Sequence, residues 1–286
     1  MHRSGVGTHK TENMKEIEKY LMNGLRFGYQ QNTVLRTEYN DNSKKIIEYL
    51  LTVNVAQQLI EWNEKEAHWS YAINLEYDVE EFLKNAFLPY RITGGLFDSE
   101  IISPGIKDFL KKEKEKKKKK EDTEFRYGRI DIGISQENIE FSGYKESISG
   151  VELKGINPTT DSVIKDIERL IKSMELSDKD FDNSIQECYC LHIKKLGGDK
   201  SLSKEEVLKN AKKKSLNNLE KNIRDNIDFG SKDIDIKIIS DDTDNFEFKS
   251  VKDFKNHPFI NDITTYEVGL ETKIVYGVII KIYRKE

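Results

Sequence analysis

The stretch Val151-Glu-Leu-Lys-Gly155, together with Arg129-Ile-Asp-Ile-Gly-Ile134 upstream of it, decides the fold of this chain. Both stretches have the apolar character of buried strands. Side chains two apart on a strand point the same way, so Glu152 and Lys154 share one face. A neighbouring strand can bring Asp131 beside them. The sequence therefore predicts two adjacent strands that group two carboxylates and a lysine.

These residue types suit a divalent cation held beside a phosphate. Mg²⁺ is a hard ion that takes carboxylate oxygens and keeps several waters, so two acids can fix it and still leave room for a substrate. A lysine ammonium, whose pKa its surroundings can lower, can orient or deprotonate a water molecule or neutralise charge that develops on the phosphate. The pattern indicates phosphodiester hydrolysis.

Asp131 followed by Glu152-Leu-Lys154 resembles the PD-(D/E)XK superfamily of restriction-endonuclease-like nucleases, over roughly residues 43 to 195. The resemblance implies an α/β (α+β) fold with a mixed central sheet flanked by helices. It also implies that Asp131, Glu152 and the Leu153 carbonyl hold Mg²⁺, with Mn²⁺ as a substitute, and that Lys154 assists the nucleophilic water. The chain has Ile130 where the family's name has proline.

The flanking sequence fits a strand-turn-helix order after Glu152 and Lys154, as the family shows. Apolar residues at helical spacing predict a leading helix over residues 43 to 62. Asn157-Pro-Thr-Thr-Asp161 predicts a turn and a helix start, and that helix should end near Met174. Residues 184 to 194 read as a buried strand, on which Cys188 and Cys190 are expected as reduced core thiols.

A further acid and several contact residues are left open by the sequence. Glu48, Glu61 and Glu76 compete for the role of the further acid. Glu76 is preferred because it lies among apolar and aromatic residues, where an unpaired acid is costly; an ordinary strand glutamate is the alternative. The residues predicted to support the site or to contact nucleic acid are Arg129, Asp166, Arg169, Lys212 and Lys213, although Asp166 and Arg169 also fit a surface ion pair.

The chain divides into an N-terminal arm (1–42) with a short helix over 13 to 23, a nuclease-like core (43–200) with a Lys-rich loop (111–124), and a C-terminal part (201–286). The last part should hold a basic helix over 203 to 224 and strands over 233 to 240 and 274 to 283 that extend the core. No apolar run is long enough for a membrane span, and we expect a cytoplasmic protein without a membrane partner.

A net charge of −4 argues against a protein that coats nucleic acid along its whole surface, so binding must be local. We expect a Mg²⁺-dependent endonuclease that acts on DNA rather than RNA, in restriction or anti-phage defence, with a homodimer or a defence-system protein as possible partner. The competing hypothesis is a catalytically silent or partner-dependent nucleic-acid-binding subunit with a nuclease-like fold.

Overall fold

A computed structural model describes residues 14, 16–35, 43–86, 128–137, 145–175, 183–197, 205–229, 233–240, 246 and 273–285. In chain order the elements are α1 (Ile17–Leu35), α2 (Ser43–Lys65), β1 (Tyr71–Asp78), α3 (Val79–Lys84), β2 (Arg129–Glu137), β3 (Lys145–Ile156), α6 (Thr160–Glu175), β4 (Glu187–Gly197), α7 (Glu205–Asn226), β5 (Ile234–Ile239) and β6 (Lys273–Arg284). The Lys-rich loop at 111–124 lies outside the described residues.

The strands form one mixed six-stranded sheet in the order β1-β2-β3-β4-β6-β5. β3 and β4 run parallel, whereas every other neighbouring pair is antiparallel. A parallel pair needs a crossover, and α6 supplies it between β3 and β4. The mixed α and β architecture predicted from the sequence is confirmed.

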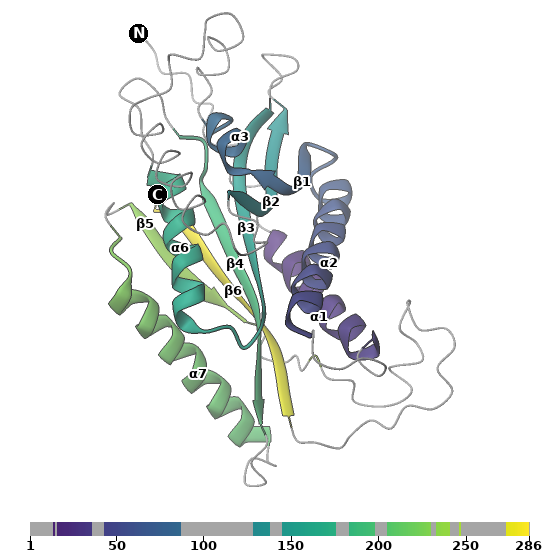
Figure 1. Cartoon of the computed structure of the whole chain (residues 1–286), viewed down its shortest axis with the longest axis vertical. Coiled ribbons are helices and arrows are strands. Elements are labelled where there is room, and N and C mark those ends of the chain that lie inside the picture. The colour runs from purple at the N-terminus through teal and green to yellow at the C-terminus, as the bar shows by residue number, and fades with distance from the viewer. Residues whose placement is uncertain are drawn as a thin grey trace, which may run out of the picture.

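Helices cover both faces of this sheet (Figure 1). α1 and α2 pack on one face, where their apolar side chains meet Ile132, Val151 and Leu191. α3, α6 and α7 pack on the other face, against residues that include Ile130, Cys190 and Ile280. Within the described part of the chain, every helix is too short or too polar to cross a bilayer.

The helix predicted over residues 13 to 23 is longer in the structure and runs from Ile17 to Leu35. The predicted end of this helix at residue 23 was therefore wrong. Gly24 and Gly28 lie where α1 packs closely against α2. Packing of Leu21, Leu25 and Tyr29 in the core outweighs the low helix propensity of glycine.

Substituting Gly24 by alanine is expected to destabilise the protein by about 2 kcal/mol. A Cβ at this position would lie 2.5 Å from the Val55 Cα, a backbone atom that cannot turn aside. On an exposed helix the same change would stabilise by up to about 1 kcal/mol, so the close contact reverses the sign. Denaturant unfolding measures the difference. Gly150→Ala is the control, because its Cβ would lie 3.4 Å from its nearest neighbours and should cost little; equal losses for both variants would contradict the packing argument.

Candidate active site

The candidate site lies where β2 and β3 part. Their pairing runs from Glu137 opposite Lys145 to Ile132 opposite Val151. One residue further along β2, the Asp131 Oδ2 accepts a hydrogen bond of 2.8 Å from the Leu153 backbone N–H. The Asp131 carboxylate thus accepts a hydrogen bond from the backbone of β3. This bond holds it against the segment that carries Glu152 and Lys154.

An irregularity in β3 follows directly. The register between β3 and β4 shifts between Leu153 and Ile156. Within this interval, the Gly155 N–H donates to the Glu48 Oε1 at 3.2 Å. A bulge of this kind redirects side chains and frees backbone groups, and such bulges occur often next to active sites. The first turns of α2 therefore supply an acid at the end of the Glu152-Leu-Lys154 segment.

The opposite side of the site is formed by α6. Asp166 Oδ2 lies 2.9 Å from the Lys154 Nζ, and Arg169 Nη2 lies 2.5 Å from the Glu152 Oε1. The direct contact between Arg169 Nη2 and Asp166 Oδ1 is longer, at 3.5 Å. Asp166 is only 7% exposed, so these two residues are not the surface ion pair that the sequence left open. We call Glu152, Lys154, Asp166 and Arg169 the ion-pair network.

The two strand carboxylates are hard to ionise in this environment. Glu152 is 2% exposed, and burial raises its pKa well above the ordinary value. The charge of Arg169 opposes this rise, while those of Asp131 and Asp166 add to it. Burial also raises the pKa of Asp131, against the hydrogen bond from the Leu153 N–H. A cation close to both carboxylates would favour the ionised form of each.

Lys154 is held as an ammonium. Burial alone would lower its pKa, but the charges of Asp166, Glu152 and Glu48 outweigh burial and the pKa is raised. The sequence left open whether Lys154 deprotonates a water molecule or acts through its charge, and the acid that α6 brings favours the charged form. A charged Lys154 can orient water or neutralise phosphate charge, but it is not a base in this state.

The structure does not bring Glu76 into this cluster. Its Oε2 pairs with the Arg129 Nη1 at 2.8 Å, and both side chains are substantially exposed. Glu61 pairs with Lys65 on α2 at 2.5 Å. Of the three competing acids, Glu48 is the one that binds the backbone next to Lys154, through the Gly155 N–H. Glu76 also has a φ of 50°, in the left-handed region that a side chain other than glycine rarely adopts.

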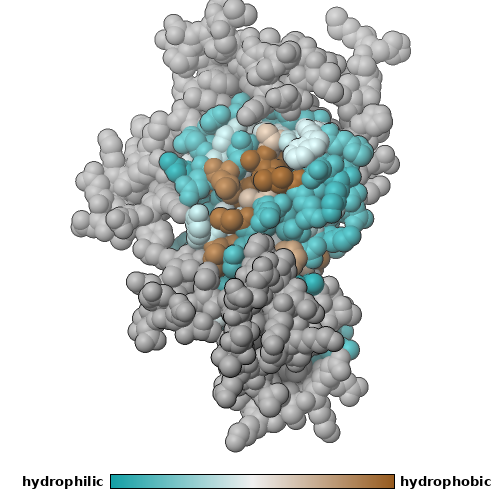
Figure 2. Space-filling view, turned by 90° about the vertical axis from the view of Figure 1, so that its right-hand side faces the viewer, coloured by the Kyte–Doolittle hydropathy of each residue, from teal (hydrophilic) through white to brown (hydrophobic). Residues whose placement is uncertain are grey.

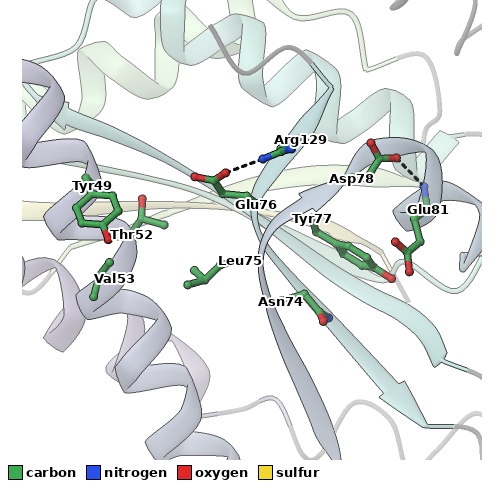
Figure 3. A pocket seen from close by; sticks show the side chains of 10 residues that line it. All are labelled: Tyr49, Thr52, Val53, Asn74, Leu75, Glu76, Tyr77, Asp78, Glu81 and Arg129. Atoms are coloured by element: carbon green, nitrogen blue, oxygen red, sulfur yellow. Dashed lines mark hydrogen bonds and ion pairs between the residues drawn. The ribbon is translucent and has the colours of Figure 1, made fainter. Parts of the chain in front are cut away.

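Glu76 and Arg129 instead line an open hollow of about 650 Å³ between α2 and the β1–α3 connection (Figure 3). Its wall combines exposed apolar side chains with three acids and one arginine. Figure 2 shows apolar side chains grouped within a hydrophilic surround on the side of the molecule that carries α1 and α2. The excess of acid does not suit a polyanion. The lining residues are Tyr49, Thr52, Val53, Asn74, Leu75, Glu76, Tyr77, Asp78, Glu81 and Arg129.

Lys212 does not lie on the basic outer face of α7. It is 3% exposed, and its Nζ lies 4.8 Å from the centre of the Tyr276 ring. The prediction that it contacts nucleic acid does not fit this burial, since Lys212 lies on the same face of α7 as the buried Leu219 and Ile223. Lys213 is exposed. Cys188 and Cys190 are buried free thiols, as expected, and burial raises the pKa of Cys188 to about 12.

The donors at the site fit Mg²⁺ by their chemistry. The described residues contain no group of three or more His, Cys, Asp or Glu side chains already gathered as metal ligands. Mg²⁺, however, binds through one or two carboxylates and keeps its waters. Around the site, the acids Asp131, Glu152, Asp166 and Glu48 outnumber Lys154 and Arg169 by two. One divalent cation would balance that excess.

Compared with known protein families, with curated proteins and with solved structures, the chain gives no significant match. The described residues form a mixed α and β fold with a six-stranded sheet covered by helices on both faces.

Proposed function

We propose that this protein is a metal-dependent nuclease with a restriction-endonuclease-like fold. The observation that carries the proposal is the gathering of Asp131, Glu152 and Lys154, from two neighbouring strands, at a place where acidic side chains outnumber basic ones. In a protein without a cation to hold, two carboxylates buried at one place are a cost that apolar residues would avoid. The mixed sheet and the strand-turn-helix order after Lys154 support the same proposal.

Each residue has a distinct role in this proposal. Asp131 and Glu152 hold the cation, with the Leu153 carbonyl as a further donor, and Mn²⁺ can replace Mg²⁺. The chemistry that the bound cation supplies is Lewis acidity toward a phosphate oxygen. Lys154, kept charged by Asp166, orients the attacking water and stabilises charge on the phosphate in the transition state. Glu48 fixes the Gly155 backbone and so the position from which Lys154 extends.

The substrate we propose is DNA, and the setting is restriction or defence against foreign DNA. The net charge of −4 favours a second candidate, a nuclease subunit that depends on a partner chain for nucleic-acid affinity. A homodimer or a defence-system protein would fill that role.

Incubation of the purified protein with supercoiled plasmid, linear duplex and RNA, each with and without Mg²⁺ or Mn²⁺, tests the proposal. Metal-dependent nicking of the plasmid is expected, and EDTA should stop it. Cation binding that depends on Glu152 without cleavage of any substrate would favour the partner-dependent subunit. A protein that neither binds a cation nor cleaves any of the three would refute the nuclease proposal.

Glu48→Ala is expected to lower the cleavage rate at least tenfold, whereas Glu76→Ala should leave it within about twofold. Glu48 touches the Gly155 backbone beside Lys154, while Glu76 contacts the exposed Arg129. Initial rates of plasmid nicking at saturating Mg²⁺ compare the two variants, which serve as controls for each other. A larger loss for Glu76→Ala would return the role of further acid to β1.

A further inference from the structure

Glu152, the carboxylate proposed above as a metal ligand, already forms an ion pair with Arg169. The Arg169 guanidinium lies 2.5 Å from the Glu152 Oε1 and 3.5 Å from the Asp166 Oδ1. Among the charged neighbours of Glu152, Arg169 most strongly favours its ionised form. In this state, an arginine provides part of the charge compensation that a metal ion would provide.

A guanidinium and a divalent cation at the same carboxylate repel each other, and little water separates them because Glu152 is 2% exposed. Metal binding therefore requires Arg169 either to move away or to tolerate a like charge at close range. Lys154 does not take its place, because Asp166 holds the ammonium at 2.9 Å. Of the two cations at the site, Arg169 is consequently the one that competes with a metal ion for Glu152.

A phosphate group is a second possible binding partner for the Arg169 guanidinium. Its side chain is 23% exposed, against 3% for that of Glu152, so part of the Arg169 side chain reaches solvent although its Nε is buried. An arginine fork binds phosphate oxygens in a bidentate manner and does so better than a lysine. A phosphodiester placed at the site would be a second partner for the same guanidinium.

We propose that Arg169 couples substrate binding to metal binding: it occupies Glu152 in the free protein, and a phosphodiester draws it away and opens the carboxylate to the metal. This inference rests on the proposed nuclease function. The coupling must be reciprocal, so the metal strengthens phosphodiester binding by the same factor that the phosphodiester strengthens metal binding. The free protein is thereby kept poorly loaded until a substrate arrives.

Calorimetric titration with MgCl₂ tests the proposal in the wild type, Arg169→Gln, Glu152→Gln and Arg224→Gln, each with and without a cleavage-resistant phosphorothioate DNA duplex. Without the duplex, Arg169→Gln should bind Mg²⁺ at least tenfold more tightly than the wild type. The duplex should tighten Mg²⁺ binding about tenfold in the wild type and little in Arg169→Gln. Arg224, an arginine paired with Glu220 and Asp235 on α7 and β5, is the matched control and should behave as wild type.

Mg²⁺ binding by Arg169→Gln that is equal to or weaker than that of the wild type would overturn the proposed coupling. The nuclease proposal would still stand if metal binding depended on Glu152. Absence of any Glu152-dependent Mg²⁺ binding, with or without DNA, would overturn both. Circular dichroism establishes that each variant is folded. Should Arg169→Gln fail to fold, Arg169→Lys replaces it. A lysine ammonium lacks the planar fork with which arginine binds a carboxylate or a phosphate in a bidentate manner, so the effect of DNA on Mg²⁺ affinity should fall at least threefold. An unchanged effect would refute the proposal.

Discussion

Glu152→Gln and Lys154→Ala should each lower the rate of DNA cleavage by about 10³-fold or more, which corresponds to about 4 kcal/mol of transition-state stabilisation. Glutamine keeps the shape of Glu152 and an oxygen that can accept from Arg169, but it lacks the charge that holds a cation. Alanine at position 154 removes the ammonium that Asp166 keeps charged. Single-turnover cleavage of a plasmid with excess protein measures the loss.

Two controls separate this loss from general damage to the fold. Glu146→Gln removes the charge of another buried glutamate on β3, and Lys281→Ala removes another ion-paired strand lysine, which contacts Glu18 and Glu187. Both should cleave at close to the wild-type rate, and all four variants should show cooperative unfolding. Cleavage by Glu152→Gln at more than about a tenth of the wild-type rate would remove the foundation of the proposed function.

Several strands and the helix α2 could be predicted from the sequence because their periodicity is local. Alternation in residues 129 to 134 and 151 to 155 correctly indicated two adjacent strands. The apolar spacing in residues 43 to 62 correctly indicated α2. Each of these patterns depends on residues close together in the chain, where a period of two or 3.6 is sufficient evidence.

The environment of the site could not be predicted in the same way. Glu48 contacts Gly155 only because a shift in the β3–β4 register leaves that N–H for a helix residue more than a hundred positions away. The preference for Glu76 came from its apolar neighbours in sequence, but β1 exposes its side chain and pairs it with Arg129. The spacing of Asp166 and Arg169 indicated a helix face, although not the strand residues opposite it. Register and packing across long separations decide these contacts.

Acid should destabilise this protein through His192, and His192→Leu should remove that part of the acid sensitivity. His192 lies on β4 with no exposed surface, and among the described residues neither ring nitrogen has a hydrogen-bond partner. Burial lowers its pKa from 6.5 to about 3, and Lys194 adds to the effect. In the unfolded chain the imidazole takes up a proton near pH 6.5, whereas in the folded protein it stays neutral until about pH 3.

The contribution of His192 to the free energy of unfolding should therefore be constant above pH 6.5. Below pH 6.5 it should fall by about 1.4 kcal/mol for each pH unit, until the pH nears the pKa of about 3 that His192 has in the folded protein. Urea unfolding from pH 8 to pH 4 should show the wild type losing stability faster than His192→Leu, although other groups titrate in both. Above pH 7 the two curves should run parallel, with the leucine variant higher by about 1 kcal/mol or more because it buries no unbonded ring nitrogen. Curves that stay parallel down to pH 4 would show that the folded protein protonates His192 as readily as the unfolded chain does. That result would require a hydrogen-bond acceptor or a water molecule at the imidazole, and the burial of this side chain would then carry no penalty in acid.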